Sequence, residues 1–170
     1  MRAGASPLIN VRKFLPADRE PVIRIIQATG VFNPAEIDVA IELMDTVIEG
    51  PATQEYELFT AAGEDGEILG YYCLGPTPLT EGTFDLYWIA VKPSAQHRGI
   101  GNRLLAHAED LAVARGGRLM VAETSSMPQY EPTRKFYLRN DYDELARIKD
   151  CYAPGDDLIT YGKYFSLSEN

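Results

Sequence analysis

The sequence predicts an α/β fold in one domain, residues 1–170, with a mixed central sheet and helices on both faces. Two observations lead to this prediction. Segments with alternating apolar residues and segments with helically spaced apolar residues follow one another in the order βααβββαβαββ. The 170 residues contain no internal repeat or low-complexity linker, and a chain of this length buries roughly two thirds of its unfolded surface.

Caps and turns predict the elements of the first half. Asp18 is placed to cap a helix that Gly30 closes. Asn33-Pro34 opens a second helix, because asparagine caps helices and proline suits a first turn. Gly50 and the proline after it end that helix. Strands are predicted at residues 9–15, 55–62 and 67–74, and a glycine-rich hairpin turn at 63–66 joins the last two.

The centre of the pattern is the stretch from residue 83 to residue 115. It opens with a strand in which Phe84, Leu86, Trp88 and Ala90 alternate with other residues, and Pro93 stops the strand pairing. A polar loop follows, and leucines and alanines at helical spacing then predict a long helix.

The loop between this strand and this helix predicts an anion site. The first N–H groups of a helix have no internal partner and the helix dipole adds partial positive charge. Gly99 and Gly101 have no side chain, so a phosphate can approach the backbone, and Arg98 adds a full positive charge. For His97 the sequence favours neither a binding role nor a plain surface role. The loop does not end in the Gly-Lys-Ser/Thr sequence of a P-loop. It also fits the dinucleotide-binding fingerprint poorly, because Leu104 stands where that fingerprint has glycine or alanine.

The second half predicts strand 118–124, a helix to residue 140, and two final strands. Gly116-Gly117 caps the central helix, and Leu119 and Val121 are the candidates for the buried face of the next strand. The following helix begins at Tyr130 or two residues later. The last strands are predicted at 143–150 and 157–165, around a turn at 151–156.

Two motifs together resemble the GNAT superfamily of N-acetyltransferases. One is the strand ending Ile-Ala-Val, then Pro93, Gln-x-x-Gly-x-Gly at residues 96–101 and a Leu-Leu helix. The other is Phe136-Tyr137 followed by Tyr142 at a helix end, with Asp141 where the family usually has glycine and Tyr130 where many members have asparagine. The resemblance implies a GNAT-like, mostly antiparallel sheet and acetyl-CoA as co-substrate.

The resemblance also implies site residues. Tyr137 matches the family's general acid, which would protonate the leaving thiolate. Asp85 and Glu123 remain alternative candidates for the base, with Asp85 slightly ahead because the central strand should point toward the cleft. Acyl-CoA contacts are implied for ten residues: Ile89, Ala90, Val91, Gln96, His97, Arg98, Gly99, Ile100, Gly101 and Asn102.

Composition argues against several other classes of function. A net charge of −9 and a pI near 4.7 argue against nucleic acid or an anionic membrane as partner. The sequence has no spaced Cys/His cluster, so we expect no metal, and Cys73 and Cys151 are expected as reduced thiols. It has neither a stretch of ~20 apolar residues nor a signal-like start at residues 1–7, which predicts a cytoplasmic protein. His107 is expected at the surface.

The resulting hypothesis is an acetyl-CoA-dependent N-acetyltransferase in which a primary amine attacks directly. The alternative is a non-catalytic acyl-CoA-binding sensor or regulatory module. The acceptor is a small-molecule or peptide amine; polyamines, aminoglycosides, basic peptide ends and amino-acid-like amines all remain open. A homodimer is plausible for such a fold.

Overall fold

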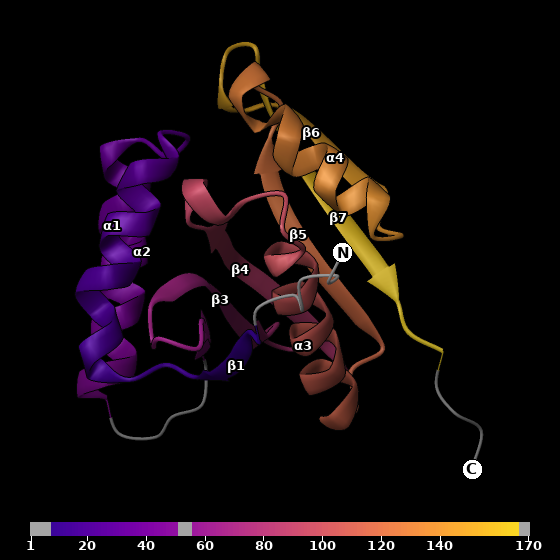
Figure 1. Cartoon of the computed structure of the whole chain (residues 1–170). Coiled ribbons are helices and arrows are strands. Elements are labelled where there is room, and N and C mark those ends of the chain that lie inside the picture. Colours follow the sequence, from indigo (N-terminus) through magenta and orange to yellow (C-terminus); the bar gives the residue numbers. More distant parts are fainter. Residues whose placement is uncertain (1–7, 51–55, 167–170) are drawn as a thin grey trace, which may run out of the picture. The chain divides into compact units, whose positions relative to one another are not determined.

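The computed structural model describes residues 8–50 and 56–166 (Figure 1). The expected absence of a signal peptide at residues 1–7 therefore concerns residues outside these ranges. The helices are α1 (Arg19–Thr29), α2 (Pro34–Glu49), α3 (Ile100–Ala114) and α4 (Glu131–Arg139). The strands are β1 (Asn10–Lys13), β2 (Glu57–Ala62), β3 (Ile68–Pro76), β4 (Thr83–Val91), β5 (Leu119–Ser125), β6 (Asp143–Ala153) and β7 (Asp156–Tyr164). None of the helices in these ranges is long and apolar enough to cross a bilayer.

The strands form a sheet in the order β1-β2-β3-β4-β5-β7-β6. β4 and β5 pair in parallel, whereas the pairs β1–β2, β5–β7 and β6–β7 are antiparallel. The predicted mixed, mostly antiparallel sheet is therefore confirmed. The chain divides into two compact units. Unit 1 contains the described residues up to Cys73 together with Trp88–His107, and unit 2 contains Leu74–Tyr87 and the described residues from Ala108 onward. That the whole chain acts as one domain stays a prediction.

The predicted helix caps of unit 1 are largely confirmed. Asn33 accepts a hydrogen bond from the Glu36 N–H, and the Glu36 carboxylate accepts one from the Asn33 N–H. Gly30 closes α1 with a left-handed φ of 65°. Asp18 precedes α1 as predicted, but its carboxylate makes no capping bond and instead binds the N–H of Leu15 and the guanidinium of Arg12. The residues after Gly50, where the second helix was predicted to end, lie outside the described ranges up to residue 55.

Helices cover both faces of the sheet in unit 1. α1 and α2 lie side by side (Figure 1), joined by an ion pair of Arg19 with Asp45, and their apolar residues form one core cluster with Tyr71 and Cys73 of β3. Tyr72 points the other way, toward α3, where its hydroxyl lies 2.7 Å from His107 Nδ1. His107 is therefore not the simple surface residue that the sequence suggested.

Gly70 explains how closely α3 and β4 approach β3. A Cβ at this position would lie 2.8 Å from the Ala90 carbonyl oxygen and 3.0 Å from Leu104 Cδ1. Both distances are shorter than ordinary van der Waals contact, so the backbone of β3 packs against its neighbours because residue 70 has no side chain.

Unit 2 contains the hairpin of β6 and β7, with α4 lying along it (Figure 1). β6 runs three residues beyond its predicted end, so the turn is narrowed from 151–156 to Pro154-Gly155, with Gly155 at a φ of 83°. Met120, Ala122 and Thr124 lie on the buried face of β5, and its last residue, Ser125, is buried as well. The predicted face of Leu119 and Val121 is half-buried. Apolar residues occur on both faces of β5, so the sequence alone did not indicate which face is buried.

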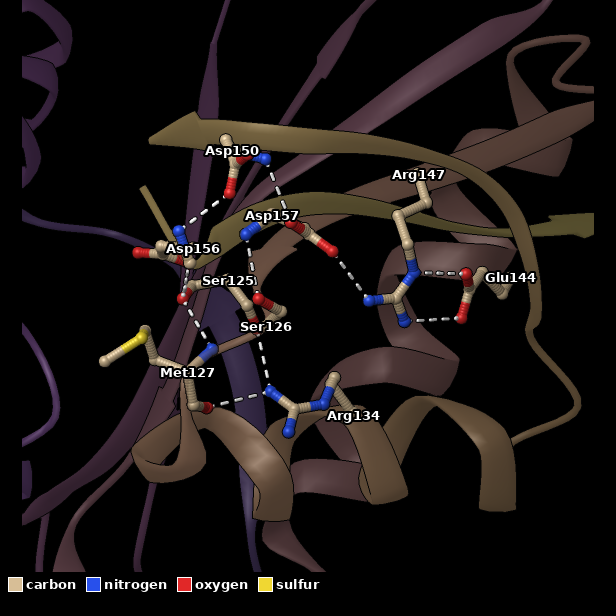
Figure 2. Close-up of polar contacts among 10 residues, drawn as sticks. Ser125, Ser126, Met127, Arg134, Glu144, Arg147, Asp150, Asp156 and Asp157 are labelled. Atoms are coloured by element: carbon tan, nitrogen blue, oxygen red, sulfur yellow. Dashed lines mark hydrogen bonds and ion pairs between the residues drawn. The ribbon is translucent and has the colours of Figure 1, made fainter. Parts of the chain in front are cut away.

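A polar network fixes the far end of this hairpin to the loop after β5 (Figure 2). Asp157 is its centre: its N–H donates to Ser126 Oγ at 2.8 Å, and its carboxylate accepts from the Asp150 N–H at 2.9 Å and from Arg147 at 3.1 Å. Ser125 bonds to Asp156, and the Ser125 carbonyl accepts from Arg134 of α4. These hydrogen bonds thus connect the β6–β7 turn, the loop after β5 and α4.

Candidate active site

The predicted anion loop of unit 1 is exposed from Gln96 to Gly99, and α3 begins at the next residue. His97 and Gly99 both have left-handed backbones, with φ values of 60° and 78°. Glycine adopts that conformation without strain, whereas other residues pay for it. The Gln96 side chain donates to the Val91 carbonyl at 3.3 Å, which ties the loop back to the end of β4.

The loop leads directly into the first turn of α3. The Arg103 N–H donates to the Gly99 carbonyl at 3.1 Å. The N–H groups of Ile100 and Gly101 come earlier in the first turn, where a helix offers no acceptor. With Arg98 exposed beside them, these groups suit an anion such as a phosphate.

Tyr137 of unit 2 sits in a cluster of aromatic rings. Its side chain is 4% exposed, and its ring lies 5.5 Å from those of Phe136 and Tyr142 and 5.8 Å from that of Tyr161, centroid to centroid. Burial raises the pKa of the Tyr137 phenol, since the charged form would lose its hydration. The phenol is therefore protonated at neutral pH and can serve as a proton donor.

The end of α4 has the backbone that its motif demands. Asp141 adopts a left-handed φ of 65°, so the aspartate takes over the role of the usual glycine. The chain then turns back, and the Tyr142 N–H donates to the Tyr137 carbonyl at 3.1 Å. Tyr142 is held from its other end by Glu109, whose carboxylate accepts from its hydroxyl and from Lys163. Tyr130, at the position where many members have asparagine, is buried at the turn before α4.

The two candidate bases lie on one face of the sheet in unit 2. Asp85 pairs with Val121 in the β4–β5 register, and Glu123 is two residues further along β5, so all three side chains share a face. Partial burial and the nearby Asp85 charge raise the pKa of Glu123. The structure thus brings Asp85 and Glu123 together as a carboxylate pair.

Thr77 is a contact of this pair that sequence reasoning missed. Its hydroxyl donates to Asp85 Oδ2 at 2.7 Å, and the Tyr87 hydroxyl approaches the same oxygen at 3.4 Å. Thr77 lies beyond the predicted strand 67–74, and β3 extends to Pro76, directly before it. No sequence signal marks this contact, because it depends on how the loop folds back onto β4.

The register between the two strands that carry the pair is short. The parallel register between β4 and β5 runs from Thr83–Leu119 to Asp85–Val121 and ends there, although both strands continue. The residues 89–91, implied as acyl-CoA contacts, belong to the continuation of β4 in unit 1. Among the described residues, no three His, Cys, Asp or Glu side chains gather as metal ligands would.

Comparison with known proteins decides the family. The model of the acetyltransferase (GNAT) family matches residues 28–142. The chain belongs to this family. It is therefore an enzyme of the acyltransferase class, and acetyl-CoA-dependent acetylation is general for its relatives.

Solved structures and curated relatives agree. A GNAT-family protein of Desulfovibrio desulfuricans is 44% identical, with a TM-score of 0.86 over 92% of this chain and 99% of that one. An aminoglycoside 6′-N-acetyltransferase complexed with coenzyme A has a TM-score of 0.73 over 95% of this chain and 99% of that one; at 16% identity it shows the shared fold. An acetyltransferase of Photorhabdus laumondii is 31% identical over 64% of this chain and 69% of its own length. An uncharacterised protein of Mycobacterium leprae is 30% identical over 59% of this chain, and the match spans 30% of that protein.

Proposed function

We propose that the protein transfers the acetyl group of acetyl-CoA to a primary amine by direct attack of that amine. The observation that carries the proposal is the carboxylate pair of Asp85 and Glu123, two acidic groups on one sheet face of the unit that also holds Tyr137. Family membership supports the acetyl donor, and the pair supports an amine acceptor.

The loop of unit 1 fits the donor. Its exposed backbone, left-handed at Gly99, and the first-turn N–H groups of Ile100 and Gly101 match the needs of a pyrophosphate. In this proposal Gln96–Asn102 hold the phosphates, with Arg98 as a supporting charge and His97 as a backbone contact. The end of β4, residues 89–91, binds the arm that leads to the thioester. Acetyl-CoA supplies the activated acetyl group, and the chain supplies binding and proton transfer.

Glu123 is the better base of the pair. A free alkylamine has a pKa near 10, so it arrives protonated and must lose a proton before it attacks. A carboxylate whose pKa is raised toward neutral holds a proton more readily than an ordinary one, and the pKa of Glu123 is raised. Asp85, held by Thr77 and Tyr87, is suited to attract and orient the ammonium group.

Tyr137 is the proposed acid. Its buried phenol stays protonated at neutral pH and can give its proton to the departing thiolate. The acceptor is a small-molecule or peptide amine, and the negative pair favours one that carries positive charge. The chain's net charge of −9 acts in the same direction.

The test is CoA release with a panel of amines, alongside calorimetric titration with acetyl-CoA. We expect turnover by the wild type and a large loss in Glu123→Gln, while Glu49→Gln, an exposed carboxylate at the end of α2, retains full activity. Tight acetyl-CoA binding without turnover on any amine would contradict the proposal and favour a regulatory acyl-CoA-binding protein.

A further inference from the structure

One buried hydroxyl of unit 2 has no hydrogen-bond partner. Thr124 is 6% exposed, and its Oγ1 forms no hydrogen bond within the described part of the chain. Leaving such a group unpaired costs about 1–3 kcal/mol, and native proteins leave few of them without a functional reason. Thr124 therefore needs an explanation beyond packing.

A second buried hydroxyl, that of Tyr71, also lacks a partner, but its setting differs. Tyr71 lies inside the apolar cluster of unit 1, among side chains of α1, α2 and β2. Tyr71 is 1% exposed, and apolar side chains of that cluster surround it. Thr124 instead lies on the part of β5 beyond the last paired residue, Val121, of the β4–β5 register. Its strand remains paired to β7 on the other edge, where Thr124 opposes Ile159.

Thr124 also shares its sheet face with the surroundings of the proposed acid. Opposed residues of a sheet point to the same side, so Thr124 and Ala122 share a face with their partners Ile159 and Tyr161. Tyr161 stacks on Tyr137, with centroids 5.8 Å apart and planes inclined by 21°. The unpaired hydroxyl therefore faces the side on which the Tyr137 ring packs.

We propose that Thr124 binds the pantetheine arm of acyl-CoA, with Oγ1 hydrogen-bonded to an amide group of the arm. The inference rests on the proposed function, because it takes acyl-CoA as the ligand. A hydroxyl both donates and accepts and carries no charge, which suits a neutral amide N–H or C=O. A neutral hydroxyl is less suited to the charged phosphates, for which the backbone N–H groups of the loop and Arg98 are the proposed contacts.

The proposal predicts opposite effects of one substitution on stability and on binding. Thr124→Val keeps the shape of the side chain but removes the hydroxyl. In the free protein this removes an unsatisfied buried group, so the melting temperature should not fall. In the complex it removes a hydrogen bond, so the affinity for CoA should fall about three- to tenfold. Thr124→Ser keeps the hydroxyl and should bind CoA like the wild type.

Calorimetry with two ligands tests this assignment. CoA contains the arm, whereas 3′-phospho-ADP contains the nucleotide and phosphates without it. We expect Thr124→Val to weaken CoA alone and to leave the affinity for 3′-phospho-ADP unchanged. Equal CoA affinity in Thr124→Val and the wild type would overturn the proposal, and so would an equal loss for both ligands. Thr124→Ala, which also lacks the hydroxyl, repeats the comparison should valine fail to fit.

The same titrations separate this inference from the proposed function. A wild type that binds neither acetyl-CoA nor CoA would refute both. A wild type that binds both, beside a Thr124→Val variant of unchanged affinity, would refute the role of Thr124 and leave the acyltransferase proposal intact.

Discussion

At the anion loop of unit 1 the backbone supplies the candidate contacts, whereas in unit 2 side chains supply them. The loop depends on left-handed residues at 97 and 99 and on the N–H groups that begin α3. In unit 2 the contacts belong to a buried phenol, a carboxylate pair and an unpaired hydroxyl. A site built from backbone groups tolerates changes in most of its side chains. A site built from side chains loses its chemistry when one functional atom, such as a hydroxyl oxygen, is removed. Substitutions at the loop should therefore affect binding, and substitutions among the side chains of unit 2 should affect turnover.

The largest effect is expected at Tyr137. Tyr137→Phe keeps the ring and its contacts with Phe136, Tyr142 and Tyr161 and removes the hydroxyl. A general acid contributes about 10²–10⁴-fold to rate, so we expect kcat to fall within that range while the affinity for acetyl-CoA and the melting temperature stay near the wild type. Steady-state rates beside calorimetry check this. Undiminished turnover would remove Tyr137 from the mechanism.

The next effect tests the backbone site. Gly101→Glu places a negative charge in the first turn of α3, where the helix itself tolerates an anion but a phosphate would be repelled. At a protein surface, two like charges about 4 Å apart repel by about 4 kcal/mol, so we expect CoA affinity to fall on the order of 100-fold or more. Gly101→Gln is the matched control, with the same bulk and no charge. Equal losses in both variants would mean that steric blockage, rather than charge, is responsible.

A third prediction sharpens the division of roles within the carboxylate pair. The Asp85 charge helps to raise the pKa of Glu123, so Asp85→Asn should lower that pKa. If Glu123 is the base, the rate of the wild type rises with pH as Glu123 loses its proton. The acidic limb of the kcat/KM profile should then move to lower pH in Asp85→Asn and disappear in Glu123→Gln. A limb that survives in Glu123→Gln and disappears in Asp85→Asn would exchange the two roles.

Local rules predicted the parts of the molecule that depend on near neighbours in the chain. The cap at Asn33 and the left-handed closure at Gly30 follow from backbone chemistry within a few residues. The contact of Thr77 with Asp85 and the hydrogen bond of His107 with Tyr72 depend on tertiary packing, over 8 and 35 residues of sequence. The pattern of apolar residues along the sequence does not predict these two contacts.

The face of β5 shows the same limit more sharply. Leu119 and Val121 are as apolar as the residues that are actually buried, so the sequence did not distinguish the two faces. The choice of face decided that Thr124 is enclosed, whereas Glu123 lies on the opposite, more accessible face, and thereby where the proposed ligand contact and the proposed base lie. The motifs thus indicated candidate site residues by type, and these stay predictions, while the surroundings of the candidates on β5 came from the register with β4 and β7.

The smallest effect concerns the hairpin network of Figure 2, which supports the side-chain site without belonging to it. A bond from the Asp150 N–H and the Arg147 guanidinium lower the pKa of Asp157. A depressed carboxyl pKa contributes stability above the unfolded value, near 3.9, and this contribution is lost as pH falls through the lower folded value. Asp157→Asn should therefore melt slightly below the wild type at pH 7, and the two should converge in acid. A difference that persists unchanged at low pH would show that packing of the turn, and not the charge of Asp157, holds the hairpin end in place.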